Sequence, residues 1–104
     1  MPYTLMTTIK PGPRMQEAES AEELASLLAE VTAIREANGG EMVLGGQDTA
    51  NGVFVSISTY PDVEAATKAS FEISVSRLVE IVSSGRFISN EDFFTGMMAA
   101  MDKA

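Results

Sequence analysis

Apolar residues recur every three or four positions between Ser20 and Gly40, the most regularly patterned stretch of the chain. Their spacing places them on one stripe of an amphipathic helix: Leu24, Leu27, Leu28, Val31 and Ile34. Ser20, with Glu23 three positions later, forms a capping box, in which side-chain oxygens accept hydrogen bonds from the free amides of the first turn. Asn38-Gly39-Gly40 supplies a left-handed exit of the kind that ends many helices. The pattern therefore predicts a helix bounded by Ser20 and Asn38.

Three shorter stretches, rich in β-branched, aromatic and aliphatic residues, predict strands: Tyr3–Ile9, Glu41–Gln47 and Val53–Tyr60. The first strand is expected to end at Lys10-Pro11-Gly12-Pro13, because proline lacks an amide donor and glycine relaxes the backbone. Asn51-Gly52 lies between the second and third stretches. This dipeptide between two apolar runs indicates a β-hairpin.

Side chains of the third predicted strand separate into two faces by alternation. One face is aliphatic: Val53, Val55 and Ile57. The other mixes aromatic rings and hydroxyls: Phe54, Ser56, Ser58 and Tyr60. We expect the aliphatic face to pack under helices. The mixed face is too polar for a dry core and too aromatic for a plain solvent face, which makes it a candidate binding surface.

A second helix is predicted to start at Pro61-Asp62, with Asp62 as its N-cap. Its later part carries an apolar stripe that runs to Ser83-Ser84-Gly85: Phe71, Val75, Leu78, Val79 and Val82. An earlier apolar set points in another direction: Val63, Ala66 and Ile73. We therefore expect a kink or break near Ser70. Alternation over Ile73–Ser76 leaves a strand open as the alternative for residues 73–82.

The end of the chain predicts a short strand at Arg86–Ile88 and a terminal helix capped by Ser89-Asn90-Glu91-Asp92. The terminal helix has its own apolar stripe: Phe93, Phe94, Met97, Met98 and Met101. The order β-α-β-β-α-β plus this helix predicts one α+β domain over residues 1–104, an antiparallel sheet in the ferredoxin-like, split βαβ arrangement. Such a sheet has helices on one face only, so its other face is expected to be covered by a partner chain.

Composition removes several classes of chemistry. The 104 residues include no Cys and no His, which excludes disulfides, thiolate or histidine metal ligands, and nucleophilic triads built on histidine. Seven Lys and Arg against 15 Asp and Glu give a net charge of −8. The basic residues are scattered singly, so neither nucleic acid nor a membrane surface is an expected partner. No apolar run reaches the ~20 residues that span a bilayer, and we expect a cytoplasmic protein without a metal or other cofactor.

The segment Val53-Phe54-Val55-Ser56-Ile57-Ser58-Thr59-Tyr60-Pro61-Asp62-Val63-Glu64-Ala65-Ala66, together with the size and the element order, resembles the dimeric α+β barrel superfamily. This group includes small antibiotic-biosynthesis-type monooxygenases and GYD-domain proteins. The resemblance implies a homodimer whose two sheets pack face to face, with a pocket on the inward face of each sheet. The mixed face of the third strand would then line the space between the sheets. Which face of the first strand turns inward stays open.

The resemblance also limits the chemistry that is expected. The cofactor-free monooxygenases of the superfamily have an Asn on this strand and a Trp at its end, and Ser56 and Tyr60 occupy the matching places here. Haem-degrading and chlorite-dismutase-like members require a His ligand, which this chain lacks. The resemblance therefore implies a cofactor-free pocket or no active site.

The candidate ligand-binding residues follow from this arrangement: Tyr60, Ser56, Ser58, Phe54 and Tyr3. A tyrosine hydroxyl can hydrogen-bond a carbonyl group of a substrate, whereas the serines have no base to activate them as nucleophiles. Arg77 or Arg86 could recognise a carboxylate, with pairing to Glu80 or Glu72 as the structural alternative. No catalytic residue and no metal ligand is assigned.

The function expected from the sequence is that of a homodimer which binds a small hydrophobic or aromatic molecule between its sheet and the partner. The first alternative is a cofactor-independent monooxygenase or isomerase, in which Tyr60 or Tyr3 would position an enolate. The second alternative is a purely structural or regulatory dimer module, whose inter-sheet space would be filled by side chains.

Overall fold

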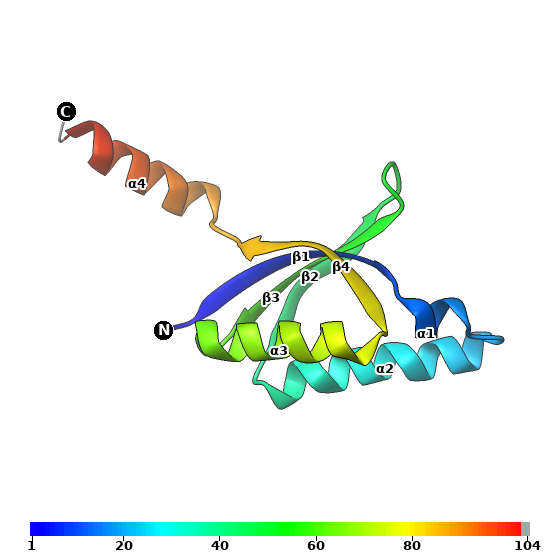
Figure 1. Cartoon of the computed structure of the whole chain (residues 1–104). Helices are drawn as coiled ribbons and strands as arrows, with labels where there is room; N and C mark the ends of the chain where they lie inside the picture. The colour runs from blue at the N-terminus through cyan, green and yellow to red at the C-terminus, as the bar shows by residue number, and fades with distance from the viewer. Residues whose placement is uncertain (103–104) are drawn as a thin grey trace.

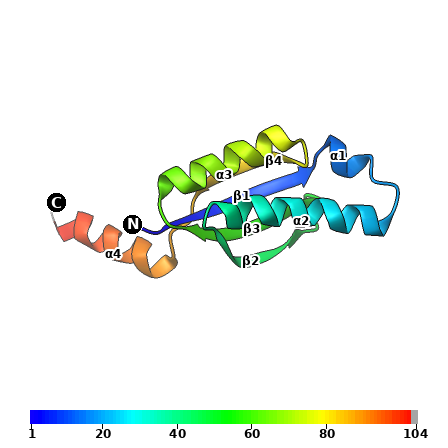
Figure 2. The same cartoon turned by 90° about the horizontal axis from the view of Figure 1, so that it is seen from below.

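The computed structural model describes residues 1–102, which form a four-stranded antiparallel sheet and four helices in an α+β fold. The elements in chain order are β1 (Tyr3–Pro11), α1 (Pro13–Gln16), α2 (Ala21–Ala37), β2 (Glu41–Asp48), β3 (Val53–Tyr60), α3 (Val63–Ser76), β4 (Val79–Arg86) and α4 (Asn90–Asp102). The strand order across the sheet is β2-β3-β1-β4. Figure 1 shows the sheet curving over α2 and α3, and Figure 2 shows these two helices side by side across the same face.

The local signals at α2 and at the hairpin are confirmed. Ser20 Oγ accepts a hydrogen bond from the Glu23 amide at 3.0 Å and caps α2. The Glu23 carboxylate accepts a hydrogen bond from the Glu19 amide at 3.1 Å. A reciprocal capping box would use the amide of Ser20, the next residue. In the hairpin, Asp48 accepts hydrogen bonds from Asn51, and Gly52 takes the left-handed conformation with φ 64°. Residues with these turn preferences therefore determine both features locally.

Residues 73–82, for which the sequence left helix and strand open, are divided between the two, so the long helix is wrong only beyond Ser76. Helix α3 is continuous through Ser70, ends at Ser76, and is followed by the left-handed Arg77 (φ 63°) and by strand β4. The Ser76 hydroxyl donates to the carbonyl of Ile73 at 2.6 Å and accepts from the Leu78 amide at 3.2 Å. Strand β4 pairs with β1 along most of its length, so the ladder of hydrogen bonds outweighs the helical spacing of the apolar residues.

The stripe that suggested the longer helix is not the packing face of α3. Phe71 and Val75 are 68% and 61% exposed. Ala66 and Ala69, which are buried, face the sheet instead. Small residues at these positions let the helix approach the sheet closely. The helical spacing predicted the wrong packing face because large apolar residues lie on the outer side of α3.

Two clusters of buried residues hold the helices to the sheet. One joins α1, α2 and the start of β4: Met15, Leu27, Val31, Leu78 and Val79. The other joins β1, β3 and α3: Leu5, Tyr60, Ala66 and Ala69. Beside the first cluster, the backbone at residue 12 lies so close to the backbone of Arg77 and Leu78 that only glycine fits. A Cβ at Gly12 would lie 2.6 Å from the Arg77 carbonyl oxygen. The short helix α1, which follows Gly12, was not expected from the sequence.

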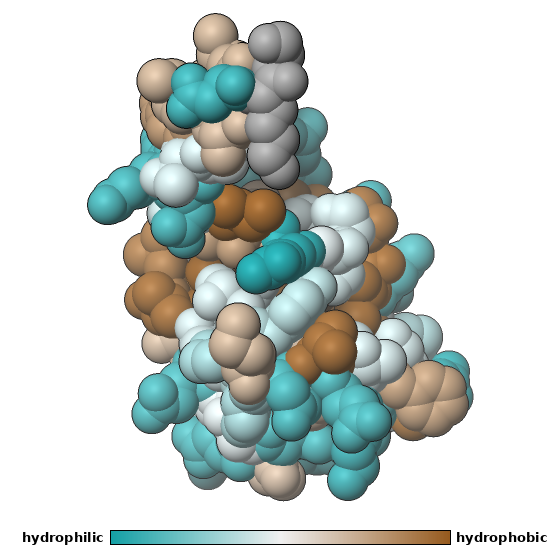
Figure 3. Space-filling view, turned by 90° about the vertical axis from the view of Figure 1, so that its left-hand side faces the viewer, coloured by the Kyte–Doolittle hydropathy of each residue, from teal (hydrophilic) through white to brown (hydrophobic). Residues whose placement is uncertain are grey.

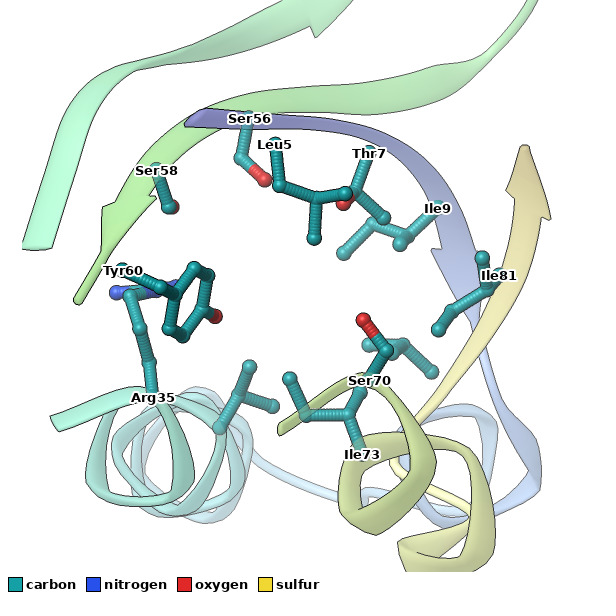
Figure 4. Close-up of a pocket in the computed structure, with 12 residues that line it drawn as sticks. Leu5, Thr7, Ile9, Arg35, Ser56, Ser58, Tyr60, Ser70, Ile73 and Ile81 are labelled. Atoms are coloured by element: carbon teal, nitrogen blue, oxygen red, sulfur yellow. The ribbon is translucent and has the colours of Figure 1, made fainter. Parts of the chain in front are cut away.

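Over residues 55–60 the structure reverses the predicted faces of β3. Ser56, Ser58 and Tyr60 point toward α2 and α3 (Figure 4). By alternation, Val55 and Ile57 lie on the opposite, open face, beside Thr8 and Met6 of β1. The sequence-based interpretation assumed that the aliphatic side would meet the helices. In the fold, the helices and β1 supply the apolar contacts of the covered face, so this face tolerates hydroxyls on β3.

Helix α4 extends away from the sheet and the other helices and contains no buried residue (Figure 1). Its bulky apolar residues are 40–63% exposed: Phe93, Phe94, Met97, Met98 and Met101. The Cα radius of gyration is 16.0 Å, against ~13 Å for a compact domain of this length. Figure 3 shows hydrophobic surface exposed below this helix on both flanks of the molecule. No helix within residues 1–102 has the length and apolarity to cross a membrane.

Candidate functional site

A small cavity of about 40 Å³ lies between the covered face of the sheet and helices α2 and α3 (Figure 4). Hydroxyl groups from three elements line it: Thr7 of β1, Ser56, Ser58 and Tyr60 of β3, and Ser70 of α3. In Figure 4 the hydroxyls of Tyr60, Ser56 and Ser70 point toward its centre. A cavity of this size admits one or a few water molecules, since one water needs roughly 10–15 Å³ of such volume. By itself it is too small for an organic ligand.

These five hydroxyls have no hydrogen-bond partner within residues 1–102. Ser58 and Tyr60 are each only 4% exposed. No fully enclosed side-chain oxygen or nitrogen in this part of the chain lacks a partner, so these unpaired hydroxyls each retain some accessible surface. Buried polar groups are stabilised by hydrogen bonds, and these hydroxyls are free to form them with a molecule in the cavity.

A larger groove of about 310 Å³ adjoins this cavity, between α2 and strands β2 and β3. Its walls are mainly apolar side chains, including Met15, Leu24, Leu28, Met42 and Phe54. Only Thr32, Arg35 and Ser56 add polar side-chain groups. Five residues line both spaces, Ile9, Val31, Arg35, Ser56 and Val79, so the apolar groove and the hydroxyl-lined cavity share a wall.

Arg35 is the one cation of this site among the described residues. It lies in the last turn of α2, is partly buried, and rises beside Tyr60 (Figure 4). Gly40 leaves room for both side chains to pack against the backbone. A Cβ there would lie 2.5 Å from Tyr60 Cε1 and 2.7 Å from Arg35 Cγ. Sequence reasoning missed Arg35. The available signal was its position one turn after Val31, where it continues the apolar stripe of α2 with a charge.

Burial raises the pKa of Tyr60 above its ordinary value of 10.0, and the nearby Arg35 guanidinium opposes that rise. Tyr60 is therefore a neutral phenol at neutral pH and can donate a hydrogen bond. The described residues contain no group of three or more His, Cys, Asp or Glu side chains that could hold a metal ion. The site offers hydrogen-bond donors, one cation and an apolar wall, an arrangement suited to binding and orienting a molecule.

We expect the raised pKa of Tyr60 to make folding sensitive to alkaline pH. A phenol whose pKa is higher in the folded chain than in the unfolded chain contributes stability below the unfolded value, and this contribution is lost as the pH rises through the folded value. Above pH 10.0 the free energy of unfolding of the wild type should therefore fall more steeply than that of Tyr60→Phe. Urea unfolding at a series of alkaline pH values measures both slopes, with a phenolate absorbance titration to follow ionisation. If the free energy of unfolding falls equally steeply with pH in both proteins, burial does not raise the pKa of Tyr60.

The predicted site residues are only partly brought together. Ser56, Ser58 and Tyr60 converge on the cavity, and Phe54 lines the groove. They do so under the chain's own helices, which corrects the expectation that they line a space between two sheets. Tyr3 lies outside both linings, at the end of β1 opposite Tyr60 in the ladder, with Arg86 Cζ 5.9 Å from its ring centre.

The two arginines considered from the sequence are also outside the site. Within residues 1–102 the only salt bridge joins Arg14 to Glu30 at 2.9 Å, so Arg77 and Arg86 do not pair with Glu80 or Glu72. The Glu72 carboxylate instead accepts a hydrogen bond from the Asn38 side chain at 2.7 Å. Arg77 serves as the left-handed residue that ends α3.

No protein-family model and no curated protein matches the chain. Among solved structures, MupZ from Pseudomonas fluorescens is similar, with a TM-score of 0.50 and 15% identity, over 97% of this chain and 84% of MupZ. The likeness to MupZ shows a shared α+β fold. A structural-genomics structure, protein YJCS, aligns with a TM-score of 0.48 and 11% identity, over 86% of this chain and 100% of its own. At these identities the likenesses carry no information on ligand or activity.

Proposed function

We propose that the protein binds a small, mainly apolar molecule in the groove and cavity between its sheet and helices α2 and α3. The observation that carries this proposal is that an apolar groove of about 310 Å³ adjoins, and shares lining residues with, a cavity lined by unpaired hydroxyls. Small-molecule sites typically combine an apolar wall with a few polar groups that set orientation. Both features are present here, on rigid elements of the fold.

Binding is tested by calorimetric titration and thermal unfolding with four probes: octanol, octanoate, naphthylmethanol and naphthoate. At least one probe should stabilise the folded chain, by about 2.7 kcal/mol at a hundredfold excess over its Kd. The proposal is overturned if all four probes leave the unfolding temperature unchanged and give no heat of binding.

A substitution that narrows the groove should weaken binding without unfolding the chain. Thr32 lines the groove from an exposed position on α2, so Thr32→Trp should raise the Kd of the best probe by about tenfold or more, because shape fit governs apolar pockets. Ala33→Trp is the matched control, since Ala33 is exposed on the same helix and outside the groove. Calorimetry measures both values. Equal Kd values for the two variants would show that the probe binds outside the groove.

We also infer that two copies of the chain assemble through the open face of the sheet and helix α4. Support comes from apolar side chains that no other element of the described chain covers: on the open face, Met6 and Leu44 are 40% and 63% exposed, and α4 has no buried residue. Soluble monomers rarely leave contiguous apolar patches of this kind uncovered. A symmetric dimer would bury both surfaces at once.

The arrangement of the elements supports a ferredoxin-like assignment within the dimeric α+β barrel superfamily. The order β2-β3-β1-β4 places the two strands of the hairpin at one side and β4 at the other, with both long helices on a single face. This is the arrangement that a split βαβ repeat produces. The proposed pocket would then belong to each protomer, not to the space between two sheets.

A further inference from the structure

Among the cations of residues 1–102, Arg35 is the one that is partly buried without an ion pair. The chain has 15 Asp and Glu residues against seven Lys and Arg, yet no carboxylate of residues 1–102 comes within 4.0 Å of the Arg35 guanidinium. Arg14, by contrast, pairs with Glu30 at 2.9 Å. A partly buried cation without an ion pair is a ready partner for an anion, and no carboxylate of the described residues pairs with Arg35.

The surroundings of Arg35 provide the other contacts that an anion would need. Ser58 and Tyr60 are more than nine-tenths buried, have no hydrogen-bond partner among the described residues and line the cavity that Arg35 also lines. Hydroxyls donate hydrogen bonds to oxygen anions, and a guanidinium matches the two oxygens of a carboxylate through parallel N–H groups. The cation and the donors therefore line one small volume.

The apolar groove opens from the same point. Arg35 and Ser56 belong to both linings, and beyond them the wall consists mainly of Leu, Met, Val and Phe side chains. A molecule bound with its charged group at Arg35 would extend its apolar body along the groove. We propose that the ligand of this pocket is a small apolar carboxylic acid, bound as its carboxylate by Arg35 with help from Tyr60 and Ser58. This inference rests on the proposed binding function and names the ligand class of the same site.

Matched acid and alcohol probes test the inference. Octanoate and octanol share one chain, and naphthoate and naphthylmethanol share one ring system, so each pair differs mainly in the charged group. Calorimetry on the wild type should show that each acid binds about tenfold to a hundredfold more tightly than its alcohol, the range expected for hydrogen bonds to a charged group. Equal affinities for acid and alcohol would overturn the inference while leaving the binding function intact. Failure of all four probes would overturn both.

Variants then assign the preference to Arg35. Arg35→Gln should weaken binding of the acid by about tenfold or more and binding of the alcohol much less, because the other apolar contacts stay in place. Arg35→Lys should retain part of the preference, since it keeps the charge and loses the forked geometry. Lys68→Gln is the control: Lys68 is exposed on α3, outside both linings, and its loss changes the net charge by the same amount.

The outcomes separate a specific site from a general effect of charge. If Arg35→Gln and Lys68→Gln weaken acid binding equally, the preference comes from overall electrostatics and the assignment to Arg35 is wrong. If Arg35→Gln weakens acid and alcohol equally, Arg35 shapes the groove and does not bind the carboxylate. Far-ultraviolet circular dichroism and the unfolding temperature of each variant confirm that the compared proteins are folded. The comparison of acid with alcohol on the wild type holds even where a variant fails to fold.

Discussion

Leu78→Ala is expected to lower the free energy of unfolding by about 3 kcal/mol, within the range for a leucine removed from a packed core. Leu78 is 0% exposed and packs with Met15, Leu27 and Val31 between the sheet and two helices. Its position between α3 and β4, beside the close approach at Gly12, leaves little room for neighbouring backbone to collapse into the space. For a domain of this size, each kcal/mol corresponds to a shift of roughly 4–8 °C in Tm. Urea unfolding at a fixed protein concentration measures the loss.

Phe71→Ala is the matched comparison for Leu78→Ala. Helical spacing alone would place Phe71 and Leu78 on one packed stripe, but the structure leaves Phe71 68% exposed on α3. Truncating an exposed side chain typically changes stability by about 0.5 kcal/mol or less. Similar losses for both variants would contradict the break between α3 and β4, because a continuous helix would bury both residues on one face.

Replacing the apolar face of α4 with glutamine is expected to convert the proposed dimer into monomers. Phe94, Met97 and Met101 lie on one face of the helix at helical spacing and are 60%, 40% and 63% exposed in the single chain. Burying an apolar side chain of this size contributes about 1.5–3 kcal/mol. The triple glutamine variant should therefore raise the dimer Kd by about a hundredfold or more. Sedimentation equilibrium measures the association of both proteins.

The control for the α4 variant is Ala99→Gln, which changes the opposite side of the same helix. This variant should associate like the wild type, because glutamine is a good helix former and Ala99 is outside the apolar face. A wild type that sediments as a monomer at all concentrations would remove the proposed dimer. An α4 triple variant that dimerises as tightly as the wild type would show that the open face of the sheet assembles without this helix.

Much of the fold could be predicted from residues that act locally. Ser20 caps α2, Asp62 caps α3 by accepting from the Ala65 amide at 2.8 Å, and the Asp48–Gly52 turn closes the hairpin. Each of these signals depends on a few neighbouring side chains and backbone amides, so no knowledge of distant contacts is needed. The α+β class followed from the order of these elements.

Strand β4 could not be predicted from local signals of this kind. Leu78, Val79 and Val82 fit a helical stripe, and only their pairing with β1 and the burial of Leu78 select the strand. Tertiary contacts regularly outweigh local propensity in short apolar segments. The same segment therefore carried two interpretations until the position of β1 beside it was known.

The site shows the same division. The sequence by itself determined that Phe54, Ser56, Ser58 and Tyr60 share one side of β3, because alternation along a strand is a property of the extended backbone. Only the tertiary structure decided that this side faces α2 and α3, and that Arg35, from a helix distant in the sequence, joins it. Which face of a sheet the helices cover depends on how both helices cross it. That choice is made by the packing of the whole chain, and it places the hydroxyls of β3 around a cavity instead of on the open face.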